Sequence, residues 1–87
     1  MYVILVYDVE VERVAKVLKV ARRYLSWVQN SVLEGELTRA QFERLKMEIR
    51  GVMDPEVDSV IFYVLRYRDM MRREQLGREK GVEGNIL

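Results

Sequence analysis

The sequence predicts an α+β fold, formed by a single domain with the element order β-α-β-β-α-β. Two apolar runs, residues 1–9 and 58–65, are short and rich in β-branched and aromatic side chains, which is typical of buried strands. Residues 11–24 and 38–52 instead repeat apolar side chains at the spacing of amphipathic helices. A chain of 87 residues has the length of one domain, so we expect residues 1–87 to form it.

The first strand is expected at residues 1–9, where no charged side chain precedes Asp8. Such a nearly continuous apolar run suits a central strand that is covered on both faces. The helix that follows, from about residue 11 to residue 24, has one apolar face. Its opposite face carries basic side chains: Arg13, Lys16, Lys19 and Arg23.

Residues 24–37 are expected to be extended, and their pattern leaves two interpretations open. Trp27 and Val28 have strand character, as do Val32 and Leu33 further on, whereas Gln29-Asn30 offers a break. The segment is therefore either a short hairpin or a sharply kinked strand.

The second helix has the clearest boundary signals. Thr38 is expected at the N-cap, and Gln41, three residues later, completes a capping box. Leu37 and Phe42 have the spacing of a hydrophobic staple around that cap. Gly51 is placed to end the helix.

After the strand at residues 58–65 the pattern weakens. Residues 66–76 are polar and rich in arginine, and we expect a turn or a short helix there. The chain closes on Asn85-Ile86-Leu87, and an apolar terminus after a polar stretch often docks on another surface. We expect the tail, residues 66–87, to pack on a partner subunit.

This element order matches the split βαβ, ferredoxin-like plan, in which both helices cover one face of the sheet. The other face needs a cover, because residues 1–9 are apolar on both sides. A second copy of the chain is the simplest candidate. A homodimer also suits a small chain that has no disulfide or zinc site to stabilise it.

The composition excludes several kinds of chemistry. With no cysteine and no histidine, the chain has no disulfide, no thiol nucleophile and no imidazole base or ligand. A metal would have to bind to oxygen, which favours Mg²⁺, Mn²⁺ or Ca²⁺. The longest apolar run is too short to span a membrane and lacks the basic leader of a signal peptide, so we expect a cytoplasmic protein with no membrane partner.

The net charge is +1, but the charges are unevenly distributed. Residues 11–24 and 66–80 contain more basic than acidic side chains, whereas residues 25–65 between them contain more acidic ones. Two basic blocks of this kind favour a face that binds a polyanion. Ordinary solvated helix faces would give the same pattern, and charge alone does not separate the two interpretations.

Asp8 is the outlier of the first strand. A carboxylate after seven uncharged residues must be solvated, paired or bound to a cation. By position alone, a tether for the loop or a cap for the next helix is the more ordinary role. Glu10 and Glu12 are possible helpers at a metal, although solvated loop acids are the more ordinary interpretation of both.

Three further residues have a functional and a structural interpretation. Arg13 and Lys16 are placed to contact phosphates along one helix edge, or to give solubility and pack their aliphatic stems. Ser31 is placed to bond a phosphate or a backbone group. Without histidine, Ser31 cannot be the nucleophile of a Ser-His-Asp arrangement.

At this point the sequence resembles the second CRISPR-associated protein family, the small partner of the CRISPR integrase. The resemblance begins with the strand end Val6-Tyr7-Asp8-Val9 and the basic helix after it. It is most specific in the stretch Val-Gln-Asn-Ser-Val-Leu-Glu-Gly-Glu-Leu-Thr at residues 28–38. It continues through Asp58-Ser59-Val60-Ile61 and the tail, and so covers nearly the whole chain.

The resemblance implies a ferredoxin-like homodimer in which the C-terminal strands are exchanged. It also implies that Asp8 binds a divalent metal, Mg²⁺ or Mn²⁺, and supports a metal-dependent nuclease, with two copies of Asp8 near the dimer axis. Arg13, Lys16 and Ser31 would lie near the nucleic acid. One departure is Leu33, where the family usually has phenylalanine.

Two classes of function follow from the resemblance, both within CRISPR adaptation. In the first, the protein is a metal-dependent endonuclease on RNA, or on DNA, with Asp8 positioning the ion. In the second, it is a structural adaptor that bridges two CRISPR integrase dimers on duplex DNA and performs no chemistry. An unrelated ferredoxin-like RNA-binding or toxin-like module is a third alternative.

Overall fold

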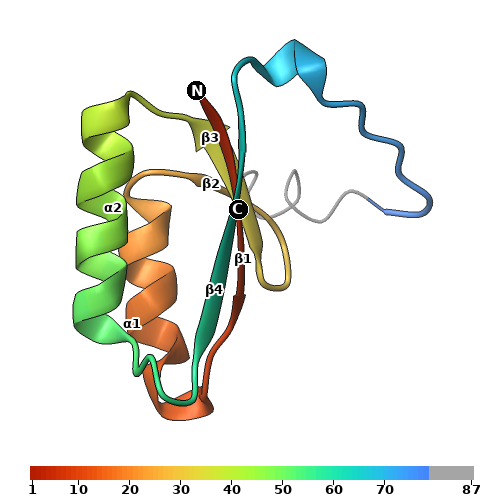
Figure 1. The fold of residues 1–87 in the computed structure, drawn as a ribbon. Coiled ribbons are helices and arrows are strands. Elements are labelled where there is room, and N and C mark those ends of the chain that lie inside the picture. Colours follow the sequence, from red (N-terminus) through yellow and green to blue (C-terminus); the bar gives the residue numbers. More distant parts are fainter. Residues whose placement is uncertain (79–87) are drawn as a thin grey trace.

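The computed structural model describes residues 1–78, which form one sheet with two helices against it (Figure 1). The elements in chain order are β1 (Tyr2–Asp8), α1 (Val11–Arg22), β2 (Ser26–Gln29), β3 (Val32–Glu36), α2 (Arg39–Val52), β4 (Ser59–Leu65) and the 3-10 turn η1 (Arg68–Met70). The end of the tail, including Asn85-Ile86-Leu87, lies outside the described residues. The expected strand exchange therefore stays a prediction.

The four strands are arranged in the order β2-β3-β1-β4, and each is antiparallel to its neighbours. Both helices lie on the same face of this sheet (Figure 1). This is the ferredoxin-like plan, so the predicted fold class is confirmed. The plan places β1 at the centre and β4 at one edge.

The segment at residues 24–37 is a hairpin, which resolves the two interpretations that the sequence left open. Strands β2 and β3 are joined by Asn30-Ser31, and Asn30 takes a positive φ of 41°. Asparagine tolerates this left-handed conformation better than most residues, and it is common in tight hairpins. The register shifts between Trp27 and Gln29, so the hairpin contains an irregularity.

The core lies between the helices and the sheet. Its fully buried members come from both helices and from the two central strands: Val3 and Leu5 of β1, Val17 of α1, Leu33 of β3 and Leu45 of α2. The rings of Phe42 and Phe62 meet edge to face, 5.3 Å between centroids, and join α2 to β4.

Helix α2 begins as predicted. The Gln41 backbone N–H donates to Thr38 Oγ1 over 3.1 Å, and the Thr38 N–H donates to Gln41 Oε1 over 2.9 Å. Leu37 and Phe42 on either side of this cap are both buried in the core. The expected end at Gly51 is wrong by one residue, because the helix continues through Gly51 to Val52.

The face of the sheet away from the helices is apolar and partly open. Ile4 and Val6 alternate with the buried Val3 and Leu5, so they point to this face. Their partners on β4, Tyr63 and Ile61, are about half exposed. We call Ile4, Val6, Ile61 and Tyr63 the open face.

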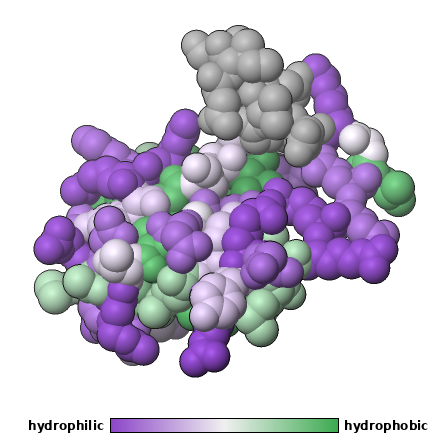
Figure 2. Space-filling view, turned by 90° about the horizontal axis from the view of Figure 1, so that it is seen from above, coloured by the Kyte–Doolittle hydropathy of each residue, from purple (hydrophilic) through white to green (hydrophobic). Residues whose placement is uncertain are grey.

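Residues after β4 cover a neighbouring part of that side of the sheet. The Arg73 guanidinium pairs with the carboxylate of Glu34, and Arg68 lies over the ring of Tyr2. The predicted turn in residues 66–76 is confirmed as η1. When the molecule is viewed from above, hydrophilic side chains occupy most of its outline, as on an ordinary solvated surface (Figure 2).

Replacing the capping residue tests the start of α2. Thr38→Ala removes one acceptor for the orphan N–H groups of the first turn, and we expect it to lower the free energy of unfolding by about 1 kcal/mol. Urea unfolding measures the change. Thr38→Ser keeps the hydroxyl and is the matched control, so equal losses in both variants would contradict the capping role.

Candidate functional site

The end of the sheet where β1 stops is the place at which the predicted site residues can meet. Asp8 is the last residue of β1, and it lies opposite Ser59, the first residue of β4. The hairpin reaches the same end, because the Tyr7 N–H donates to the Ser31 carbonyl oxygen over 3.0 Å. Helix α1 starts three residues after Asp8 and brings Arg13 and Lys16 into its first turns.

Asp8 is exposed, and its carboxylate makes no hydrogen bond or ion pair within residues 1–78. It lies two and four residues after Val6 and Ile4, on the same face of the strand, so its side chain points to the side of the open face. Capping of α1 by Asp8 is wrong, because Glu10 occupies the N-cap position. The exposed carboxylate is therefore available for a ligand.

The carboxylate oxygens at this end of the sheet suit a hard cation, but a single chain supplies few of them. No group of three acidic side chains in residues 1–78 is arranged to hold a metal ion. Mg²⁺ takes one or two carboxylates and keeps several waters, so a single Asp8 fits as a partial ligand. A second carboxylate or a substrate phosphate would have to complete the coordination.

Ser31 lies at the tip of the β2–β3 hairpin and is half-buried. The hairpin backbone beside it is held firmly, because the carbonyl oxygen of Asn30 accepts from Trp27 Nε1 over 2.9 Å and from the Tyr7 hydroxyl over 3.3 Å. The structure therefore fixes where Ser31 lies. Its contact with a phosphate stays a prediction.

The basic face of α1 is partly neutralised by acidic side chains. Arg23 lies 3.1 Å from Glu48 on α2, and Arg13 pairs with Asp58 just before β4. Lys16 and Lys19 are exposed. The two lysines are therefore better placed than the two arginines to meet a phosphate backbone.

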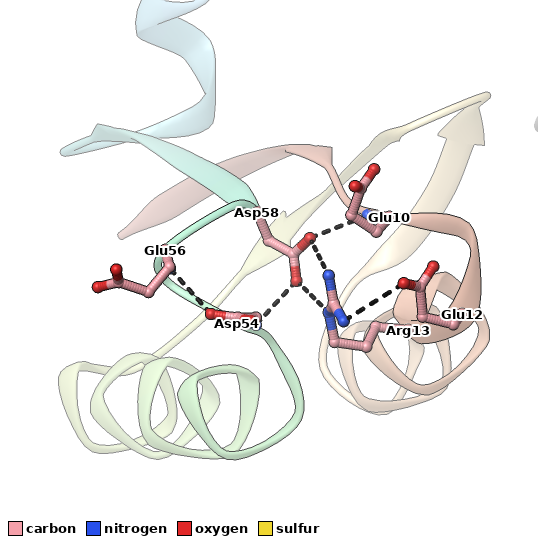
Figure 3. Close-up of polar contacts among 6 residues, drawn as sticks. All are labelled: Glu10, Glu12, Arg13, Asp54, Glu56 and Asp58. Carbon is pink, nitrogen blue, oxygen red and sulfur yellow. Dashed lines mark hydrogen bonds and ion pairs between the residues drawn. The ribbon is translucent and has the colours of Figure 1, made fainter.

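Asp58 is the residue that the sequence reasoning missed. Its side chain is fully buried, and it accepts from Arg13 Nε over 2.6 Å and from Arg13 Nη2 over 3.0 Å (Figure 3). The N–H groups of Glu10 and Asp54 donate to the same carboxylate over 2.9 and 2.8 Å. An acid between a proline-containing loop and an apolar strand was the available signal.

We call this arrangement of Asp58, Arg13, Glu10 and Asp54 the Asp58 clamp. The bidentate Arg13 contact, and then the two backbone N–H groups, hold the pKa of Asp58 well below its ordinary value despite burial. The same contact raises the pKa of Arg13. Both groups are therefore charged across the physiological range, and the clamp is a permanent ion pair.

The fold and the site together define a small ferredoxin-like protein with one exposed carboxylate at the end of its central strand. A family model described as CRISPR associated protein Cas2 matches residues 1–73. The chain is 56% identical over 87 residues to the "CRISPR-associated endoribonuclease Cas2" of Thermotoga maritima, with both chains fully covered.

Solved structures agree with this match. A structure described as the crystal structure of Cas2 is 46% identical, with a TM-score of 0.85 over 92% of this chain and 90% of that one. Streptococcus pyogenes Cas2 at pH 6.5 is 36% identical, with a TM-score of 0.78 over 88% of this chain and 100% of that one. The chain belongs to the Cas2 family of CRISPR-associated proteins, as its resemblance implied.

The structure also shows where Leu33 lies and what kind of helices the chain forms. Leu33, which departs from the family's phenylalanine, is fully buried beneath the helices, so its side chain does not reach the surface. Within residues 1–78, no helix has both the length and the apolar character needed to cross a bilayer.

The acid dependence of stability tests the clamp. Because the folded-state pKa of Asp58 lies below its ordinary value of 3.8, the clamp stabilises the fold above that pH and loses this effect on further acidification. Asp58→Asn removes the charge and leaves Arg13 without its partner. We expect thermal unfolding to show a gap between wild type and Asp58→Asn that is widest near neutral pH and narrows below about pH 4. A gap that does not depend on pH would contradict the ion pair.

Proposed function

We propose that this chain is a metal-dependent endonuclease of CRISPR adaptation, in which a homodimer cleaves phosphodiester bonds at Asp8. The observation that carries the proposal is the carboxylate of Asp8, which is exposed at the end of a central strand and has no partner among residues 1–78. The name endoribonuclease, which the Thermotoga maritima and Pyrococcus furiosus relatives carry, supports RNA as the first substrate to test. Acting on CRISPR nucleic acids places the protein in the cytoplasm.

The proposed homodimer is supported by the exposed apolar groups of the sheet. Ile61 and Tyr63 of the open face remain 46% and 55% exposed. Both lie on β4, an edge strand whose outer side is unpaired within residues 1–78. Exposed edges of this kind invite pairing with another chain. A second copy of the chain would cover them.

In the proposed reaction, Asp8 would hold Mg²⁺ or Mn²⁺, which would supply an activated water and charge neutralisation at the phosphate. Asp8 holds its position through the ladder with Ser59 of β4. Lys16 attracts the phosphate backbone, and Ser31 presents a hydrogen-bonding group from the hairpin. These residues of one chain bind and orient the substrate, and the partner's Asp8 would supply the second carboxylate.

A second candidate function is a non-catalytic adaptor that bridges CRISPR integrase dimers on duplex DNA. One observation favours it: residues 1–78 of a single chain contain no group of three acidic side chains arranged to hold a metal, so Asp8 alone would be a weak site. The exposed lysines of α1 suit duplex DNA as well as RNA, because contacts to phosphate carry no sequence information. The integrase would be the protein partner in this role.

Asp8→Ala tests the nuclease. We expect wild type to cut labelled single-stranded RNA or duplex DNA when Mg²⁺ is present, and Asp8→Ala to fall to the background rate because the metal loses its protein ligand. Gel analysis of the products measures both. Glu56→Gln is the matched control, since this exposed acid lies on the α2–β4 loop and its side chain points away from the Asp58 clamp (Figure 3). Cutting that persists in Asp8→Ala would contradict the site.

Assembly tests the adaptor. We expect Asp8→Ala to bind the CRISPR integrase and duplex DNA as wild type does, because the exposed lysines and the open face are unchanged. Size-exclusion chromatography of the mixture, read by light scattering, measures the complex. Wild type and Asp8→Ala that both assemble but never cut would favour the adaptor. Loss of assembly in Asp8→Ala would contradict it.

A further inference from the structure

At Asp8, the last residue of β1, the strand is paired with β4 alone among the described elements. Pairing with β3 stops at Val6 opposite Val32, and the last contact on that side is the Tyr7 N–H to Ser31. Asp8 is paired with Ser59 and, in the described part of the chain, has no strand on its other side. The direction of its side chain therefore depends on how the following residues are held.

The Asp58 clamp holds those residues. The Glu10 N–H, two residues after Asp8, donates to Asp58 Oδ1 over 2.9 Å. Asp58 itself directly precedes Ser59, the pairing partner of Asp8. The two chain segments that meet at Asp8 are thus fixed to one buried carboxylate, immediately beyond the last pair of the ladder.

Arg13 completes the Asp58 clamp, and moving its side chain out of the clamp would be energetically unfavourable. Its guanidinium makes two hydrogen bonds to a carboxylate that is fully buried, and its own side chain is 24% exposed. Moving Arg13 onto a phosphate would leave the Asp58 charge buried without a cation, which is strongly unfavourable. Lys16, one turn later on α1, is exposed and forms no ion pair with an acidic side chain of residues 1–78.

We infer that Arg13 and Asp58 are positioning residues for Asp8: together they fix the end of β1 so that its carboxylate is held ready for the cation. Arg13 is then a part of the site's support and not a phosphate contact. This inference rests on the proposed function, because it concerns how well Asp8 binds a divalent metal. It assigns phosphate binding on α1 to Lys16.

Arg13→Lys is the decisive variant, since lysine keeps a point charge for a phosphate but loses the planar fork that grips Asp58. We expect Arg13→Lys to bind Mn²⁺ about 10- to 100-fold more weakly and to cut RNA more slowly by a similar factor, as when other supporting residues of metal sites are lost. Calorimetric titration with Mn²⁺ alone gives a readout that does not depend on cleavage. Arg50→Lys, an exposed arginine in the last turn of α2, is the matched control.

The salt dependence of RNA binding, measured in the absence of metal, separates the two roles of Arg13. Removing one phosphate contact lowers the slope of log K against log salt by about 1. We expect Lys16→Ala to show that decrease and Arg13→Gln to keep the wild-type slope. A smaller slope in Arg13→Gln would overturn the inference.

The state of the fold is followed in the same samples. Circular dichroism confirms that each variant is folded at the assay temperature, and deuterium exchange of the Glu10 amide reports the clamp directly. We expect this amide to exchange faster in Arg13→Lys than in Arg50→Lys. Unchanged exchange together with unchanged Mn²⁺ affinity would overturn the inference while the nuclease stood. A wild type that neither binds Mn²⁺ nor cuts would instead overturn the proposed function, and this inference with it.

Discussion

The buried carboxylate of Asp58 joins two parts of the chain that are distant in sequence, the junction of β1 with α1 and the loop before β4. It receives hydrogen bonds from the loop after β1, from the first turn of α1 and from the loop before β4. A buried charge is tolerated only when opposing charge and hydrogen bonds compensate its lost hydration. The two loops must therefore keep the spacing that satisfies Asp58, and the geometry of the sheet end beside them follows from that requirement.

The open face imposes a second constraint on the same end of the sheet. Side chains alternate along a strand, so Asp8 points to the side that carries Ile4 and Val6. Whatever covers these apolar residues also approaches the carboxylate. If the cover is a second copy related by a two-fold axis, equivalent residues near that axis come together, and two copies of Asp8 could share one cation. Dimer formation and metal binding would then depend on the same surface.

The features predicted best from the sequence are those that depend on interactions between residues close together in the chain. Thr38 and Gln41 are three residues apart, and their reciprocal hydrogen bonds need nothing from the rest of the chain, so the start of α2 was correct. The end of that helix was placed one residue early, because a glycine in a last turn is tolerated when packing holds the helix. The pairing of Arg13 with Asp58 spans 45 residues, and no local pattern reports it. The sequence therefore offered Arg13 as a candidate phosphate contact without indicating its buried partner.

The same reasoning changes how the basic face of α1 should be interpreted. Counting charges along the helix treats every cation as available, whereas the tertiary structure assigns Arg13 to Asp58 and Arg23 to Glu48. An arginine can form a planar, bidentate pair and is readily used inside a fold, whereas the ammonium group of a lysine is strongly hydrated and stays in water. Under the proposed function, exposed cations such as Lys16 would therefore be the charges that an incoming polyanion meets. Fewer basic groups of α1 therefore contribute to the long-range attraction of a polyanion than the number of basic residues in its sequence indicates.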